Sequence, residues 1–270
     1  MQHTPIWQME FGDGPLVACA IHDGHFVRAD VATRLNLAAS QRLYEEDPFT
    51  AVWTAIAPTR IIGRRSRFEI DFNRPRDKAV YMTPADAWGL EVWKEPPPAS
   101  VVNHSLRVYD EFYAHLKRVL DLLVSFHGEV VVFDLHSYNH ERDGCGTGAA
   151  NCDGNPEINL GTGTMARALW APIVDCWLGA MREFDFLGRR LDVRENVKFF
   201  GGQLARWIHE NYSSSVCVLA IEVKKFFMNE WTGELYTEQH EAIGRALAYA
   251  ATAVNDELQK VKSGPAAGKF

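Results

Sequence analysis

Residues 129–137, with the sequence EVVVFDLHS, decide the fold class of this chain. The first five residues form a run too apolar to present one face to water, which is typical of a central parallel strand covered on both sides. The Asp-Leu-His-Ser that follows brings side chains that can carry chemistry. We therefore expect a buried strand at 129–133 with polar residues at its carboxyl end, where sheets of this kind place their sites.

Similar apolar runs and helical periods flank this stretch. Residues 15–21 and 216–223 are predicted to form two further buried strands, and 106–126 repeats apolar residues every three or four positions, as an amphipathic helix does. The other expected elements are strands at 60–62, 68–72 and 191–199, helices at 28–45, 165–184, 203–212 and 237–261, and a glycine-rich loop at 143–163. This alternation predicts a single α/β domain over residues 1–270, with a mainly parallel sheet between helix layers and a frayed tail at 262–270.

The composition is that of an ordinary globular protein. Of the 270 residues, 28 are basic and 35 are acidic, which gives a net charge of −7, and 47% are hydrophobic. The acidic balance argues against a nucleic-acid partner, because phosphate binding depends on clustered Lys and Arg. No apolar run approaches the roughly 18 residues of a membrane span, and residues 1–14 lack a signal-peptide pattern. Five scattered cysteines without a C-x-x-C pair favour reduced thiols and a cytoplasmic location.

Histidines and carboxylates lie at the ends of the best predicted strands. His22 and His25 come after the first strand, His136 comes after the central strand, and Glu222 lies within the last strand. This set fits a catalytic zinc ion, which takes three ligands from histidine and carboxylate and leaves the fourth position for water. We predict one zinc ion held by His22, His136 and either His25 or Asp47, with Glu222 as the proton shuttle.

Each of these residues also has a structural interpretation. An isolated histidine near a strand end is more often hydrogen-bonded in the core than bound to a metal. Asp134 would then only orient His136 or cap a turn, and Glu222 would point outward into solvent. The joint placement of these side chains on three separate strands favours the metal site.

A basic segment at residues 64–74 forms a second group of interest. Its simplest interpretation is a solvated charged stretch, but Arg67, Asn73 and Arg74 punctuate a segment that resembles a strand. Arginine can hold a carboxylate through two parallel hydrogen bonds, which lysine cannot do. These three residues are therefore predicted to contact a small acidic substrate.

Together, the motifs resemble those of the N-formylglutamate amidohydrolase family, which belongs to a wider group of zinc hydrolases related to carboxypeptidase A and aspartoacylase. The matching pieces occur in the family's order: AIHDG at 20–24, SRFEIDFNR at 66–74, DLHS at 134–137, NVKFFGG at 196–202 and IE at 221–222. The resemblance implies a single domain with a mixed, mostly parallel twisted sheet of the zinc-carboxypeptidase type. It also implies one zinc ion and hydrolysis of an N-acyl amino acid such as N-formylglutamate, or of a related acidic amide.

The resemblance also implies roles for individual residues. His22 and His136 match the zinc histidines and Glu222 matches the catalytic glutamate. Asn73 and Arg74 match the pair that holds the substrate carboxylate, with Arg67 beside them to polarise the scissile carbonyl or to bind the acid.

This sequence departs from the family pattern at two places. The wider group has a glutamate three residues after the first histidine, where this chain has His25, and Asp47 matches an aspartate that can serve instead in the formylglutamate branch. The segment after Asp-Leu-His-Ser is longer than usual and carries His140 and the glycine-rich loop. Two other functions stay open, namely a carboxypeptidase-like metallopeptidase and a non-catalytic binder of small carboxylic acids.

Overall fold

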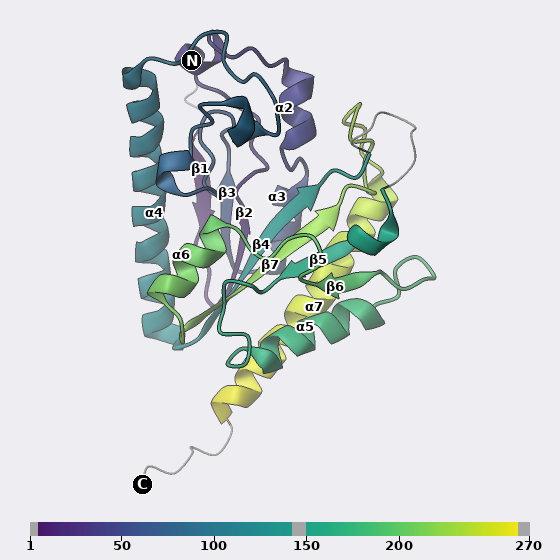
Figure 1. The fold of residues 1–270 in the computed structure, drawn as a ribbon. Coiled ribbons are helices and arrows are strands. Elements are labelled where there is room, and N and C mark those ends of the chain that lie inside the picture. Colours follow the sequence, from purple (N-terminus) through teal and green to yellow (C-terminus); the bar gives the residue numbers. More distant parts are fainter. Residues whose placement is uncertain (1–4, 142–149, 264–270) are drawn as a thin grey trace.

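The computed structural model describes residues 5–141 and 150–263. Within these residues, seven strands form one sheet in the order β1-β3-β2-β4-β7-β5-β6 (Figure 1). The strands are β1 (Trp7–Glu10), β2 (Leu16–Ala20), β3 (Thr59–Gly63), β4 (Val130–Tyr138), β5 (Ile158–Gly161), β6 (Val193–Glu195) and β7 (Val216–Lys224). Four neighbouring pairs are parallel, whereas β1 with β3 and β5 with β7 are antiparallel. The predicted α/β class, with a mixed and mostly parallel sheet, is confirmed.

Helices cover both faces of this sheet (Figure 1). The helices are α1 (Ala29–Ala32), α2 (Ala39–Glu45), α3 (Thr50–Trp53), α4 (Ala99–His127), α5 (Ala171–Glu183), α6 (Gln203–Asn211) and α7 (Thr237–Ser263), with short 3-10 helices at Thr54–Ile56, Arg76–Lys78, Pro84–Ala87 and Cys152–Gly154. Side chains of α4 and α6 form one hydrophobic layer with the sheet, and side chains of α5 and α7 form the other. The two layers are what a mainly parallel sheet requires, because neither of its faces can be left to water.

The central strand β4 is buried along its whole length. Alternate side chains enter the two layers: Val130 and Val132 pack on the side of α4 and α6, and Val131, Phe133 and Leu135 pack on the side of α5 and α7. The prediction of a doubly covered strand is therefore confirmed. The strand is longer than predicted and ends at Tyr138, so the Asp-Leu-His-Ser motif belongs to the strand itself.

The long amphipathic helix is α4, which begins directly after Pro98 and ends at Gly128. Its buried side chains recur at helical spacing and include Val101, Val108, Phe112, Leu116, Leu120 and Leu123. Gly128 has a positive φ of 76°, which a residue without a Cβ adopts at little steric cost, and this stops the helix.

The predicted helix at 28–45 is wrong, because the chain forms two short helices there. Between α1 and α2 the backbone N–H of Asn36 donates to the Val92 carbonyl at 2.9 Å. Leu35 and Leu37 are buried in a small separate cluster. The apolar residues of this segment therefore pack in that cluster and form a strand-like contact. They do not form one face of a single helix.

The predicted strand at 68–72 is also wrong. Its backbone turns, with the N–H of Glu69 donating to the Ser66 carbonyl at 2.9 Å. Ile70 and Phe72 still pack in the hydrophobic layer that α4 and α6 form with the sheet. The Asp71 side chain lies outside that layer, next to His22. The alternation that suggested a strand comes from a turn that buries both kinds of side chain.

Several smaller elements differ from the predictions. Strand β5 lies within the predicted loop at 143–163, and β1 has no predicted counterpart. The strand predicted at 191–199 is shorter, because only β6 forms there, and α5 starts only at Ala171. Strands of three or four residues carry too few side chains for a periodic pattern to be visible. The helix α7 continues to Ser263, and the rest of the tail predicted to fray lies outside the described residues, as does 142–149 of the loop.

Two further properties of the described residues bear on the predictions. None of their helices combines the length and the apolar character that crossing a membrane requires. Cys19, Cys152, Cys176 and Cys217 are unpaired.

Candidate active site

A cavity of about 690 Å³ opens at the carboxyl edge of the parallel strands β2, β4 and β7. His22 follows the end of β2 by two residues, while His136 and Glu222 lie near the ends of β4 and β7. Parallel neighbours end at the same edge of a sheet, so these side chains meet although they are far apart in sequence. The predicted site residues that line the cavity are His22, Asp47, Arg67, Asn73, Arg74, His136 and Glu222.

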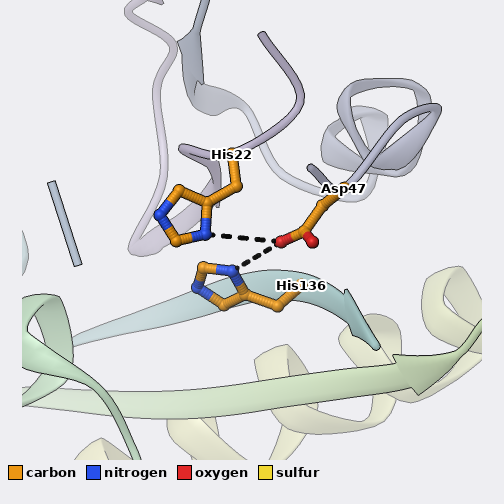
Figure 2. Close-up of side chains that lie close together, drawn as sticks. All are labelled: His22, Asp47 and His136. Atoms are coloured by element: carbon orange, nitrogen blue, oxygen red, sulfur yellow. Dashed lines mark hydrogen bonds and ion pairs between the residues drawn. The ribbon is translucent and has the colours of Figure 1, made fainter. Parts of the chain in front are cut away.

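His22, Asp47 and His136 converge at the inner end of this cavity (Figure 2). Asp47 Oδ2 lies 3.0 Å from His136 Nδ1 and 3.5 Å from His22 Nδ1. One nitrogen or oxygen of each residue lies within 4.8 Å of the others, and all three residues are buried. Two imidazole nitrogens and one carboxylate oxygen in this arrangement form a donor set that fits zinc.

His25, the other candidate for the third ligand, does not join this cluster. Its Nδ1 lies 2.5 Å from Glu46 Oε2, and its side chain is 41% exposed. Two residues three positions apart share one face when they lie in a helix, but the chain after His22 is irregular and α1 begins only at Ala29. The geometry therefore favours Asp47 over His25.

A carboxylate lies within hydrogen-bond distance of the Nε2 atom of each of the two histidines in the cluster. His22 Nε2 lies 2.7 Å from Asp71 Oδ1, and His136 Nε2 lies 3.0 Å from Asp134 Oδ1. If each Nε2–H donates to its carboxylate, each Nδ1 keeps a lone pair toward Asp47, which is the tautomer that a metal ligand needs. Asp134 does orient His136, as the structural interpretation proposed, and it does so within a site.

The charges around the cluster stabilise one another. Burial alone would raise the pKa of Asp47, but hydrogen bonds with His136 and His22 lower this pKa far below its usual value. Burial also opposes the charge on His136, yet Asp134 and Asp47 beside it raise the pKa of the ring well above the usual value. A group of carboxylates that favours a protonated imidazole so strongly also favours a bound cation.

Glu222 lies beside the cluster on the neighbouring strand. It pairs in register with His136 across β4 and β7, so both side chains leave the sheet on the same face. Its partly buried side chain lines the cavity, which rules out the outward orientation into bulk solvent. Burial raises the pKa of Glu222 to about 8, near the value that suits a general acid and base at neutral pH.

Arg67 is held rigidly in the cavity wall. Its Nε donates to the Tyr81 hydroxyl at 2.9 Å, and its two Nη atoms donate to Asp71 Oδ2 at 2.8 Å and to the Glu45 carbonyl at 3.2 Å. Burial opposes its charge, but Tyr81 and Asp71 raise the pKa of Arg67 well above the usual value. The guanidinium also lies 4.8 Å from the centre of the Trp88 ring. Arg67 therefore presents a fixed positive charge to the cavity.

Asn73 connects α6 to the cluster. Its Oδ1 accepts from the backbone N–H of Leu204 at 3.0 Å, and its Nδ2 lies 3.3 Å from His136 Nε2. A Cβ at Gly202 would stand 2.2 Å from Asn73 Oδ1, so the glycine in the NVKFFGG segment makes this close approach possible. Arg74 is less constrained, because its side chain is 39% exposed and reaches Asp71 only at 4.0 Å.

Several residues that line the cavity or contact its lining had no clear signal in the sequence. Asp71 was seen only as part of a motif, and Tyr81, Trp88 and Lys225 had no signal in their spacing. They reach the site from three separate parts of the chain, so only the tertiary contacts identify them. The pairing of Asp71 with His22 had one usable sign, namely that Asp71 is one of two carboxylates in a basic segment.

Comparisons with known proteins bear on the family and the fold. A family model described as N-formylglutamate amidohydrolase matches residues 14–228. The crystal structure of N-formylglutamate amidohydrolase from Ralstonia eutropha JMP134 has a TM-score of 0.73 and 18% sequence identity, covering 94% of this chain and 98% of that chain. The structure of a gene product from Agrobacterium tumefaciens has a TM-score of 0.65 and 16% identity, covering 96% and 97%. A search of curated protein sequences finds no match.

At these identities the two structures show a shared fold and nothing finer. A putative carboxypeptidase A from Shewanella denitrificans also aligns, with 11% identity over 93% of this chain and 61% of that chain. Its TM-score of 0.34 is too low to support the carboxypeptidase part of the predicted fold.

Proposed function

This chain belongs to the N-formylglutamate amidohydrolase family, and from its site we propose that it is a zinc-dependent hydrolase of N-acyl amino acids. The proposed substrate is N-formylglutamate or a related small acidic amide. The observation that supports this most directly is the convergence of His22, Asp47 and His136 beside Glu222 in one cavity that arginines also line. A structural set of histidines would not need a titratable carboxyl group and fixed cations around it.

We assign the metal ligands to His22 Nδ1, Asp47 Oδ2 and His136 Nδ1. Zinc bound there would polarise the acyl carbonyl and lower the pKa of a water at its open position. Asp71 and Asp134 keep the two rings in the tautomer and orientation that this role requires.

Glu222 is the proposed proton shuttle. With a pKa near 8, its carboxyl group can accept a proton from the attacking water and return it to the leaving amide nitrogen. A group whose pKa lies close to the working pH performs both transfers without a large penalty. Its position beside His136 in the sheet register places the shuttle next to the ligands.

We propose that Arg67 and Arg74, which line the cavity, bind the acid and stabilise negative charge. Arg74 can bind a substrate carboxylate because its side chain is partly exposed and its ion-pair contact with Asp71 is long. Arg67 already uses three donors on protein groups, and its fixed charge suits the oxygen of the scissile carbonyl. Asn73 stands between them with its amide beside His136.

Metal content and substrate preference together test this proposal. We expect protein purified without added metal to contain close to one zinc ion per chain, and to lose activity with a chelator and regain it with zinc. A panel of N-formyl amino acids, N-acetyl amino acids and short peptides should show the fastest hydrolysis for acidic N-formyl compounds. Preferential cleavage of peptides would instead indicate a carboxypeptidase-like enzyme. The absence of both zinc and hydrolysis would indicate a binder of small carboxylic acids.

A further inference from the structure

The segment that carries Asp47 lacks the support of regular structure. Helix α2 ends at Glu45, and Glu46 has extended backbone angles. Glu45, Glu46 and Asp47 are all buried, with exposed fractions of 7%, 0% and 2%. Buried backbone outside helices and strands must find hydrogen-bond partners elsewhere, so other parts of the chain hold this segment.

Lys225 provides two bonds to this part of the chain, in addition to those that the Asp47 backbone makes with the His22 carbonyl and with Thr50. Its Nζ donates to the carbonyls of Tyr44 and Glu46, each at 2.7 Å. Asn139 Nδ2 adds a second bond to the Tyr44 carbonyl at 2.8 Å, and Arg67 bonds the Glu45 carbonyl at 3.2 Å. One ammonium thus ties two carbonyls on either side of Glu45, immediately before the proposed ligand.

The position of Lys225 gives these bonds a consequence for the site. It directly follows β7 and comes three residues after Glu222. Its side chain is 1% exposed, and among the described residues its ammonium forms no ion pair within 4.0 Å. Burial lowers the pKa of Lys225 to about 8, so keeping this charge in the interior is costly. The nearby carboxylates of Asp47, Glu45 and Glu230 offset part of that cost, and the carbonyls of 44 and 46 accept the hydrogen bonds of the ammonium.

We propose that Lys225 is a positioning residue that holds Asp47 in place as the third metal ligand, and this rests on the proposed function of the site. Asp47 must keep one oxygen close to both Nδ1 atoms. A ligand on an irregular segment achieves this only when the segment is fixed beforehand. Lys225 fixes it to the strand that carries Glu222, so the third ligand and the proton shuttle share one support.

Zinc affinity, measured by competition with a chromophoric chelator, tests this proposal independently of turnover. We expect Lys225→Met to weaken zinc binding about 10-fold to 100-fold, which is typical when a residue supporting a ligand is removed. Lys225→Gln, which keeps one donor, should lose less. Lys224→Met is the matched control and should leave zinc affinity unchanged, because in the described part of the chain the Lys224 ammonium makes no hydrogen bond.

A double-mutant cycle distinguishes positioning from a general effect on stability. In an Asp47→Ala background, Lys225→Met should weaken zinc binding no further, because the residue it positions is already gone. Urea unfolding of the metal-free variants shows whether each one folds, and Lys225→Gln replaces Lys225→Met in the cycle if the latter does not. A wild type that binds zinc while Lys225→Met and Lys225→Gln bind it equally well would overturn this inference alone. An equal loss with and without Asp47 would also overturn it. A wild type that binds no zinc would instead refute the proposed function.

Discussion

The two buried histidines of the site and the buried His209 have opposite surroundings. At the site, His22 and His136 have carboxylate oxygens beside both ring nitrogens. On helix α6, His209 Nε2 accepts from the backbone N–H of Val218 at 3.0 Å, and its Nδ1 lies 3.0 Å from the Thr164 hydroxyl. Burial lowers the pKa of His209 to about 4, whereas the pKa of His136 is raised in spite of burial.

This difference shows that burial alone does not mark a functional histidine. His209 is neutral because burial opposes its charge and its neutral partners do not offset that effect. His136 has carboxylates beside both ring nitrogens, which favour a positive charge on or near the ring. The sign of the charge around the ring therefore distinguishes the two kinds of buried histidine. The predictions for His209 and Asp71 test that distinction, and the prediction for Glu222 tests the function proposed for the site.

The largest effect is expected for Glu222→Gln. The amide occupies the same volume but cannot accept a proton, so kcat should fall about 10²-fold to 10⁴-fold. Zinc content should stay at the wild-type level, because Glu222 is not among the proposed ligands. Steady-state kinetics and elemental analysis on the same preparation check both parts. Glu238→Gln, on the exposed start of α7, is the control, and full activity of Glu222→Gln would contradict the shuttle role.

A smaller effect, on stability rather than activity, is expected at His209. Its pKa of about 4 in the folded chain lies below the usual value of 6.5 for histidine, so the unfolded chain takes up a proton first. The neutral ring therefore contributes stability that is fully present above pH 6.5 and is lost as the pH falls toward 4. A shift from 6.5 to 4 corresponds to about 3 kcal/mol, at about 1.4 kcal/mol per pKa unit.

The variant His209→Gln tests this contribution, because its amide oxygen can still accept from Val218 but does not titrate. Urea unfolding of metal-free protein at pH 7 and pH 4.5 should show the stability gap between wild type and variant shrinking at the lower pH. His104→Gln, on the exposed side of α4, should leave the gap constant. A gap that grows on acidification would mean that His209 is charged in the folded chain.

The smallest of the three effects is expected for Asp71→Asn. This change removes the negative charge that holds His22 Nε2, and zinc affinity should fall about 10-fold to 100-fold. Chelator competition measures the change, and Asp110→Asn is the control because Asp110 belongs to an exposed ion pair with Arg76. Unchanged affinity would show that His22 does not depend on its carboxylate, and the comparison with His209 would lose its physical basis.

The parts of the fold that could be predicted are those with long local patterns. The apolar runs of β2, β4 and β7 and the helical period of α4 each span enough residues to be recognised without tertiary information. Strands β1 and β5 could not be predicted, since each has only four residues. The strand predicted at 68–72 is wrong because this segment buries Ile70 and Phe72 from a series of turns, and the result resembles the alternation of a strand.

By itself, the sequence determined the α/β architecture, the placement of His22, His136 and Glu222 at one edge of the sheet, and the motifs that its family shares. Only the tertiary structure decided that Asp47 rather than His25 completes the cluster, that Asp71 and Asp134 hold the two rings, and that Lys225 supports the segment before Asp47. The physical reason is the range of the interactions. Hydrophobic periodicity depends on residues that are close together in the sequence. The bond from Lys225 to Glu46 joins positions 179 residues apart and exists only once the sheet has formed.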